Sequence, residues 1–145
     1  MSSKSVAVDA WEALFRAQVA VLRQLHDEFP SDEVSFNEYD VLFNLARQPG
    51  RGSRLRDLNR HLLLTQPSVS RLVDRLVGRD LVTKQPDPDD GRGTIVTLTT
   101  TGYSLFRKVA VVHAESISAR VGGTLTIDEL RTLTVLCDKL RLDPT

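Results

Sequence analysis

The chain has 145 residues, of which 41% are hydrophobic and 26% are charged. This length suits one domain with a core of its own and is too short for two ordinary domains. The one cysteine, Cys137, excludes an intramolecular disulfide framework and a cysteine-based zinc finger. Because apolar runs stop at three or four residues and the N-terminus is polar, we expect neither a membrane span nor a signal peptide, and therefore a cytoplasmic protein.

The charges balance over the whole chain but are unevenly distributed along it. Residues 1–50 carry a net charge of −4, residues 51–84 carry +5, and residues 85–145 carry −1. A basic middle segment between acidic ends favours a localised contact with a polyanion. The alternative interpretation is a solvated helical face that is rich in arginine.

Two helices are predicted in the first third of the chain. Residues 6–29 contain no proline or glycine, stop before Pro30, and repeat apolar side chains at helical spacing. The next helix is predicted over residues 36–47, because Ser35 and Glu38 have the spacing of a capping box and Pro49-Gly50 follows as a terminator.

Two short helices with a tight turn between them are predicted at residues 54–62 and 65–78. Thr65 is placed to cap the second helix, and Pro67 is tolerated in its first turn. One arc of this second helix is entirely apolar, and it consists of Val69, Leu72, Val73, Leu76 and Val77. Polar and basic side chains then occupy the other side.

After Gly78 the pattern changes from helical spacing to alternation. The β-branched stretches at residues 81–85 and 94–99 predict a β-hairpin, and the turn-forming residues 86–93 predict a long, charged tip. Helical spacing returns at residues 102–121, and a second capping box from Thr126 to Glu129 begins the last helix. We therefore expect a mainly α protein with a small β-hairpin, in the α+β class.

The two short helices have the organisation of a helix-turn-helix, in which the second helix enters the major groove of DNA. Such a helix needs an apolar back and small polar or arginine side chains in front. Free amides at its N-terminus can face phosphate groups. The candidate DNA-binding residues are Thr65, Gln66, Ser68, Ser70, Arg71 and Arg75.

The segment that carries these features resembles the MarR family of bacterial transcriptional regulators. The resemblance rests on Leu55-Arg56-Asp57-Leu58, Ser68-Val69-Ser70-Arg71-Leu72-Val73-Asp74-Arg75-Leu76, Asp80-Leu81-Val82, Asp90-Gly91-Arg92 and Leu98-Thr99-x-x-Gly102. It implies a single domain over residues 1–145, with a winged helix-turn-helix lobe at 35–101 and the hairpin at 81–99 as its wing. It also implies dimerisation helices at residues 6–30 and 102–145.

Two positions depart from the family pattern. Asp80 stands where the family commonly has glycine, and since aspartate tolerates the left-handed conformation, we expect the turn to be kept. Gly91 stands where the wing tip often has a second basic residue, which leaves Arg92 as the matching DNA contact. The aspartates at positions 87, 89 and 90 would repel phosphate unless they are paired or turned away. An ion pair within the hairpin is the alternative role of Arg92.

The terminal helices carry more apolar side chains than a chain of this size needs for its own core, which predicts a homodimer. The candidate dimerisation residues are Leu22, Leu25, Leu130, Leu133, Leu136 and Leu140. The resemblance further implies a pocket for a small aromatic ligand between the dimerisation helices and the DNA-binding lobe. Its candidate lining is Trp11, Phe15, Phe43, Phe106 and His113, and the simpler interpretation of each is a core side chain.

We recognise no residue set for catalysis, for metal binding or for a cofactor. The histidines are far apart, and the sequence has no phosphate-binding glycine loop and no nucleophile motif. We therefore expect no enzyme and no cofactor. The resemblance implies a ligand-responsive repressor that binds a pseudo-palindromic operator as a homodimer. The alternative is a winged-helix module that binds a protein partner through residues 65–78 and does not bind DNA.

Overall fold

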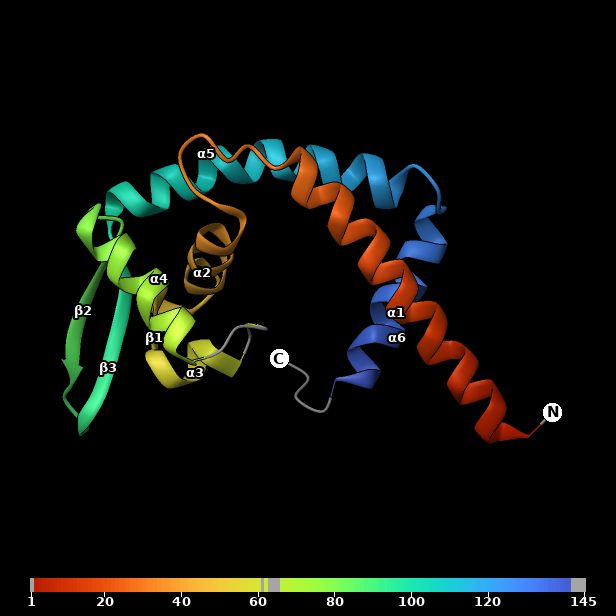
Figure 1. Cartoon of the computed structure of the whole chain (residues 1–145), viewed down its shortest axis with the longest axis horizontal. Coiled ribbons are helices and arrows are strands. Elements are labelled where there is room, and N and C mark those ends of the chain that lie inside the picture. Colours follow the sequence, from red (N-terminus) through yellow and green to blue (C-terminus); the bar gives the residue numbers. More distant parts are fainter. Residues whose placement is uncertain (1, 61, 63–65, 142–145) are drawn as a thin grey trace. The chain divides into compact units, whose positions relative to one another are not determined.

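The computed structural model describes residues 2–60, 62 and 66–141, and the chain forms two compact units (Figure 1). Unit 1 contains the described residues up to Phe29 and from His113 onward, and unit 2 contains Pro30–Val112. Helices dominate both units, and a three-stranded antiparallel sheet lies in unit 2. The expected mainly α fold with a small β component is therefore confirmed. Across the described residues, no helix has the length and apolar character that a membrane span requires.

Unit 1 is made of helices from both ends of the chain. α1 (Ser3–Glu28) begins earlier than predicted, because Ser2 caps it by accepting a hydrogen bond from the Ser5 amide. α6 (Ile127–Leu140) begins at the predicted capping box, in which the side chains of Thr126 and Glu129 each accept a hydrogen bond from the other residue's amide. The Arg120 guanidinium forms an ion pair with Glu28, which joins the segment before α6 to α1.

A long helix passes from unit 2 into unit 1. α5 (Thr100–Ile117) ends in one π-helical turn, η2 (Ser118–Gly122), where the sequence predicts continuous α-helix. The chain is tightly folded at this point, because a Cβ on Gly123 would lie 2.5 Å from the Ala119 carbonyl oxygen. Glycine at position 123 leaves room for the wider turn.

Unit 2 packs helices and the sheet around one core. α2 (Phe36–Ala46) begins at the predicted capping box of Ser35 and Glu38. α3 (Leu55–Arg60) and α4 (Gln66–Gly78) form the predicted pair of short helices. Each helix places an apolar face toward the sheet, and the largest fully buried side chains are Val34, Val41, Leu42, Leu45, Leu58, Val69, Val73, Leu76, Val82 and Val96.

The β-hairpin is longer, and its tip shorter, than the sequence predicts. β2 (Val82–Asp87) and β3 (Asp90–Leu98) leave only Pro88 and Asp89 between them, so the prediction of a long tip at residues 86–93 is wrong. Strand pairing continues through Pro86 and shifts its register at Asp87. This irregularity allows the ladder to run into a segment that is rich in turn-forming residues.

A third strand is not predicted by the sequence pattern, because it is too short to show alternation. β1 (Gly52–Arg54) follows a 3₁₀ turn, η1 (Pro49–Arg51), and pairs with β3, so that the sheet has the order β1-β3-β2. A Cβ on Gly52 would lie 2.9 Å from the Thr97 hydroxyl oxygen. The strand therefore depends on a glycine at this position and on a partner more than forty residues away, as the Gly52–Thr97 pairing shows.

The turn between α4 and β2 packs directly against the start of α5. Asp80 adopts the left-handed conformation (φ 59°), as expected for the residue that replaces a family glycine. The Thr99 hydroxyl donates to the Asp80 carbonyl oxygen at 2.6 Å and accepts from the Gly102 amide at 2.9 Å. A Cβ on Gly102 would lie 2.0 Å from the Leu81 carbonyl oxygen, so only glycine fits at this contact.

We predict that Gly102→Ala lowers the free energy of unfolding by about 1–3 kcal/mol, because the new methyl group forces the backbone of Leu81 away from α5. Urea unfolding at one fixed protein concentration measures the change. Gly78→Ala is the matched control, because a Cβ on Gly78 meets no atom within 4 Å. If both variants unfold at the wild-type urea concentration, the contact between Gly102 and Leu81 does not constrain the fold.

Candidate nucleic-acid interface

The two sides of α4 differ sharply in burial. Its apolar arc is buried in the core of unit 2, including Val69, Val73 and Leu76. On the other side, Arg71 and Arg75 are exposed, while Ser68 and Ser70 are half-buried. This division follows from helical periodicity, because burying one arc turns the opposite arc toward solvent. The predicted arrangement of an apolar back and a polar, basic front is therefore present.

The exposed arginines of α4 differ in their contacts. The Arg71 guanidinium donates to the Ser68 hydroxyl at 3.5 Å. Within the part of the chain that the structure describes, Arg75 forms no ion pair. Thr65 lies outside the described residues, and Gln66 is the first residue of α4. The predicted roles of Thr65 and Gln66 at the helix N-terminus therefore stay predictions.

Ion pairs connect α4 to the elements on either side of it. Lys84 on β2 lies 2.9 Å from the Asp74 carboxylate, and Arg79 lies 3.8 Å from Glu38 on α2. None of these four side chains is fully buried, so each of the two ion pairs contributes little to the free energy of unfolding. Their effect is to restrict the orientation of a helix whose buried arc already fixes its position.

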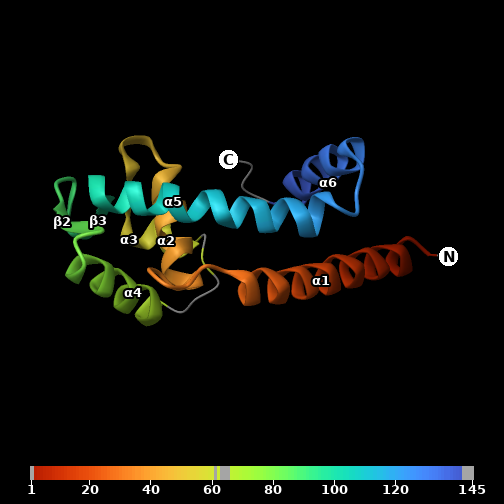
Figure 2. The same ribbon diagram turned by 90° about the horizontal axis from the view of Figure 1, so that it is seen from above.

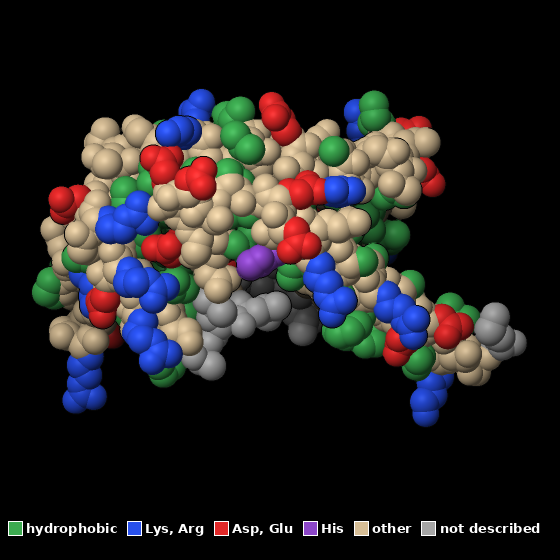
Figure 3. Space-filling model, turned by 45° about the horizontal axis from the view of Figure 1, so that its top comes forward, with side chains coloured by type: hydrophobic (Ala, Val, Ile, Leu, Met, Phe, Trp, Pro, Cys, Tyr) green, Lys and Arg blue, Asp and Glu red, His purple; other side chains and the backbone are tan. Residues whose placement is uncertain are grey.

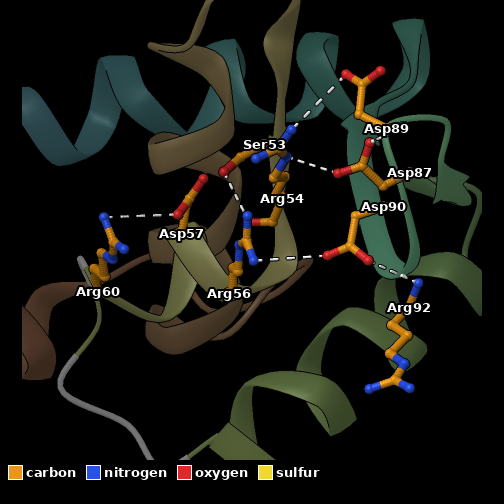
Figure 4. A network of polar contacts seen from close by, with 9 residues as sticks. All are labelled: Ser53, Arg54, Arg56, Asp57, Arg60, Asp87, Asp89, Asp90 and Arg92. Atoms are coloured by element: carbon orange, nitrogen blue, oxygen red, sulfur yellow. Dashed lines mark hydrogen bonds and ion pairs between the residues drawn. The ribbon is translucent and has the colours of Figure 1, made fainter.

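The three aspartates of the hairpin are paired with arginines from β1 and α3 (Figure 4). Asp87 Oδ2 lies 2.7 Å from Arg54 Nε, and the Asp87 side chain is only 1% exposed. Asp89 lies 4.0 Å from the same guanidinium, and Asp90 lies 3.8 Å from Arg56. The negative charge at the wing tip is therefore partly neutralised within the protein, which reduces the expected repulsion of phosphate.

Arg92 is exposed on β3, and its backbone amide donates to Asp90 Oδ1 at 3.1 Å. Its guanidinium extends away from the aspartates in Figure 4. Among the residues that the structure describes, it makes no ion pair, so the alternative of a pair within the hairpin is not realised. Arg92 therefore presents a free cation at the wing.

Basic side chains beside the wing line a common cleft. In the space-filling view, Lys and Arg lie over both units, with Asp and Glu between them (Figure 3). A cleft of about 290 Å³ beside the wing is lined by Arg54, Arg56 and Arg92 together with Asp87 and Asp90. Arg54 and Arg56 are not among the residues predicted to bind DNA. Both belong to the basic run that begins at Arg51, and Arg56 also lies in a segment that carries the family resemblance.

The five candidate ligand-pocket residues fall into two groups. In unit 2, the Phe43 and Phe106 rings lie 6.3 Å apart, and Tyr39, which the sequence analysis does not identify, stacks on Phe106 at 5.6 Å. In unit 1, the rings of Trp11 and Phe15 lie 5.7 Å apart and both are exposed. His113, the other candidate in unit 1, is buried.

His113 packs against the edge of the Phe29 ring, with the ring centroids 5.3 Å apart. Burial lowers the pKa of His113 below its usual value, because desolvation disfavours the charged imidazolium. The residue is therefore a neutral core histidine at pH 7, as the simpler interpretation of the sequence has it. The described residues contain no cluster of three or more side chains able to hold a metal ion.

The candidate dimerisation residues lie on helices that bury no side chain within one chain. α1 and α6 have no buried residue among those described, although both carry apolar stripes. Leu22, Leu133, Leu136 and Leu140 are exposed, while Leu25 and Leu130 are half-buried. Figure 2 shows α1, the end of α5 and α6 as separate rods. Apolar surface of this extent is unusual for a monomer in water.

Comparison with known proteins agrees with this geometry. A sequence model described as MarR family matches residues 32–93, which include α2 to the start of β3. The multiple antibiotic resistance protein MarR of Escherichia coli (strain K12) is 31% identical over 84 residues, which are 58% of this chain and 58% of that protein. The chain therefore spans a little over half the length of the curated relatives that it matches first.

Two further relatives match over more of the chain. The HTH-type transcriptional regulator YkoM of Bacillus subtilis (strain 168), itself uncharacterised, is 32% identical over 117 residues, which are 79% of this chain and 73% of that protein. The crystal structure of Sco3205, a MarR family transcriptional regulator from Streptomyces coelicolor in complex with DNA, has a TM-score of 0.76 at 25% identity. That match covers 94% of this chain and 85% of Sco3205. With its helix pair, its β-hairpin wing and these relatives, the chain belongs to the MarR family.

Proposed function

We propose that the protein is a transcriptional regulator that binds double-stranded DNA as a homodimer and represses by occupying a pseudo-palindromic operator. The observation that carries this proposal is the front of α4, where Arg71 and Arg75 are exposed directly opposite a buried apolar arc. An α-helix fits the major groove, and arginine there can donate two hydrogen bonds to one guanine. The half-buried serines Ser68 and Ser70, which precede Arg71, are small enough to allow a close approach to the bases.

The wing supplies a second contact of a different kind. The Arg92 guanidinium points away from the aspartates of the wing (Figure 4). Those aspartates form ion pairs with Arg54 and Arg56 instead. Arginine favours narrow minor grooves, where the negative potential of DNA is enhanced. We expect Arg92 to contact the backbone or the minor groove beside the major-groove site of α4. Contacts to phosphate position the protein, and contacts to base edges specify the sequence.

We expect Arg71→Ala to weaken binding to a duplex from the promoter of the protein's own gene by roughly 1–3 kcal/mol and to relax sequence preference. Arg75→Ala tests the neighbouring position in the same way. Fluorescence anisotropy against the promoter duplex and a scrambled duplex measures both effects. Lys108→Ala is the matched control, because Lys108 is an exposed cation on α5 that pairs with Glu33. Unchanged affinity in both arginine variants would mean that α4 does not read the bases.

Dimerisation explains the exposed stripes of α1 and α6 and gives the operator its symmetry. A second copy can cover apolar side chains that one chain leaves in water. Two-fold symmetry then sets two copies of α4 about 34 Å apart, which is one turn of DNA. A dimer of this kind binds two half-sites at once and gains affinity from both.

We predict that Leu133→Asp dissociates the dimer and weakens operator binding together. Leu133 lies on the apolar stripe of α6 and is 41% exposed in one chain, so a charge there would be buried in the dimer at high cost. Val135→Asp is the control, because Val135 is 58% exposed and lies on the opposite side of α6 at helical spacing. Sedimentation equilibrium at micromolar concentration measures both. A wild-type monomer under these conditions would contradict the proposal.

We also infer that a small aromatic ligand regulates DNA binding, and among the candidate residues Phe43 and Phe106 lie together in unit 2. The cluster of Tyr39, Phe43 and Phe106 supports this inference, because stacked rings accept another aromatic ring favourably. A ligand changes DNA affinity only if it binds the DNA-incompetent arrangement more tightly than the competent one.

Among benzoates and phenols, we expect at least one compound to weaken operator binding by about 5–150-fold, the usual range for such coupling. Titration calorimetry of the ligand with and without operator checks the reciprocal effect, because the operator must weaken ligand binding by the same factor. A broad panel without any such compound would leave a constitutive DNA-binding protein. A protein that binds no duplex at all would instead favour the alternative of a protein-interaction module.

A further inference from the structure

The wing is attached to the rest of unit 2 by a buried ion pair at its tip. Arg54 is the last residue of β1, and its Nε lies 2.7 Å from Asp87 Oδ2 at the end of β2. The carboxylate is 1% exposed, whereas the arginine side chain is 38% exposed. A carboxylate removed from water in this way requires a partner, because an unpaired buried charge is strongly unfavourable.

Asp87 also organises the tight turn of the hairpin. Its Oδ1 accepts a hydrogen bond from the Asp89 amide at 2.9 Å. Gly93, on the returning strand, leaves room for the carboxylate, because a Cβ there would lie 3.1 Å from Asp87 Cβ. The side chain of Asp87 thus connects three parts of the structure, namely the turn, β3 and Arg54.

A second set of contacts continues from this turn to Arg92. Asp90 lies 3.8 Å from Arg56 on α3, and its Oδ1 accepts the Arg92 amide at 3.1 Å. The backbone that carries the free guanidinium is therefore held through Asp90, one residue from the turn that Asp87 closes (Figure 4). Displacement of the turn would move Arg92 with it.

We propose that the ion pair between Arg54 and Asp87 positions the wing for DNA binding, so that Asp87 supports binding although it is an acidic residue near a polyanion. This inference rests on the proposed DNA-binding function and adds positioning residues that make no contact with DNA. Arg54 pairs with Asp87 and Asp89 and thereby holds the hairpin in position. Arg92 then contacts the DNA. The competing possibility is that Arg54, which lines the cleft beside the wing, binds a phosphate itself and that Asp87 competes with the phosphate.

Replacing the aspartates separates these possibilities, because they predict changes of opposite sign. Asp87→Ala removes one negative charge, and a phosphate-binding Arg54 would then bind DNA more tightly. We expect the reverse, with weaker binding to the promoter duplex and a salt dependence reduced by about one counterion unit, since the contact of Arg92 is lost. Asp89→Ala is the matched control, because it removes the same charge from a side chain that is 82% exposed. It should leave affinity unchanged or slightly increased.

Combination with Arg92→Ala tests whether Asp87 acts through Arg92. Arg92→Ala alone should reduce the slope of affinity against salt by about one unit. Adding Asp87→Ala should then reduce it no further, because the contact that Asp87 supports is already absent. Arg54→Met should behave like Asp87→Ala, and Arg54→Lys should restore part of the affinity by keeping a cation near the carboxylate.

Amide hydrogen exchange of the free protein gives a readout that does not involve DNA. Asp87→Ala and Arg54→Met should speed exchange at the amides of Asp89 and Arg92, whereas Arg60→Met should not, because Arg60 pairs only with Asp57 on its own helix among the described residues. Asp87→Asn replaces Asp87→Ala if the latter does not fold. Tighter DNA binding by Asp87→Ala, equal behaviour of Asp87→Ala and Asp89→Ala, or unchanged wing amides would each overturn this inference. A wild type that binds no duplex would instead overturn the proposed function, and this inference with it.

Discussion

Burial of one arc of α4 in the core of unit 2 is the constraint on which the rest of the interface depends. Val69, Val73 and Leu76 are fully covered by the other helices and the sheet, so the helix cannot rotate without exposing them to water. Their burial turns Arg71 and Arg75 outward. The same packing therefore stabilises the fold and presents the basic face, and a substitution that loosens the core would also disturb that face.

The formal net charge of the chain is zero, but positive and negative side chains are unevenly distributed along it. The wing has three aspartates close to its one free arginine, which by composition alone opposes DNA binding. In the folded chain, Arg54 and Arg56 form ion pairs with these carboxylates and so reduce their negative potential. Among the residues that the structure describes, Arg92 forms no ion pair, whereas each of the three aspartates has an arginine within 4.0 Å. Such an ion pair is weak evidence for added stability, because the cost of removing the charges from water offsets their attraction.

The terminal helices differ from the helices of unit 2 in what they bury. α1 and α6 have apolar stripes at helical spacing, yet neither buries a side chain within its own unit. Such surfaces lose the hydrophobic contribution that folding normally provides. Association of two chains recovers it and, in a two-fold arrangement, also defines the spacing of the two copies of α4. In the proposed homodimer, one interface therefore provides both stability and the symmetry that a pseudo-palindromic operator requires.

The sequence by itself determined the helices and the polarity of α4, because capping boxes and apolar periodicity are local signals. Ser35–Glu38, Thr126–Glu129 and the arc beginning at Val69 all occur where they are predicted. The left-handed turn at Asp80 was likewise predictable from one residue. Only tertiary structure decided β1, the short tip of the hairpin and the partners of its aspartates. Gly52 pairs with Thr97, and Arg54 with Asp87, across long stretches of chain. Contacts between residues so far apart in the chain produce no local periodicity in the sequence. They form only when the tertiary structure brings the two segments together.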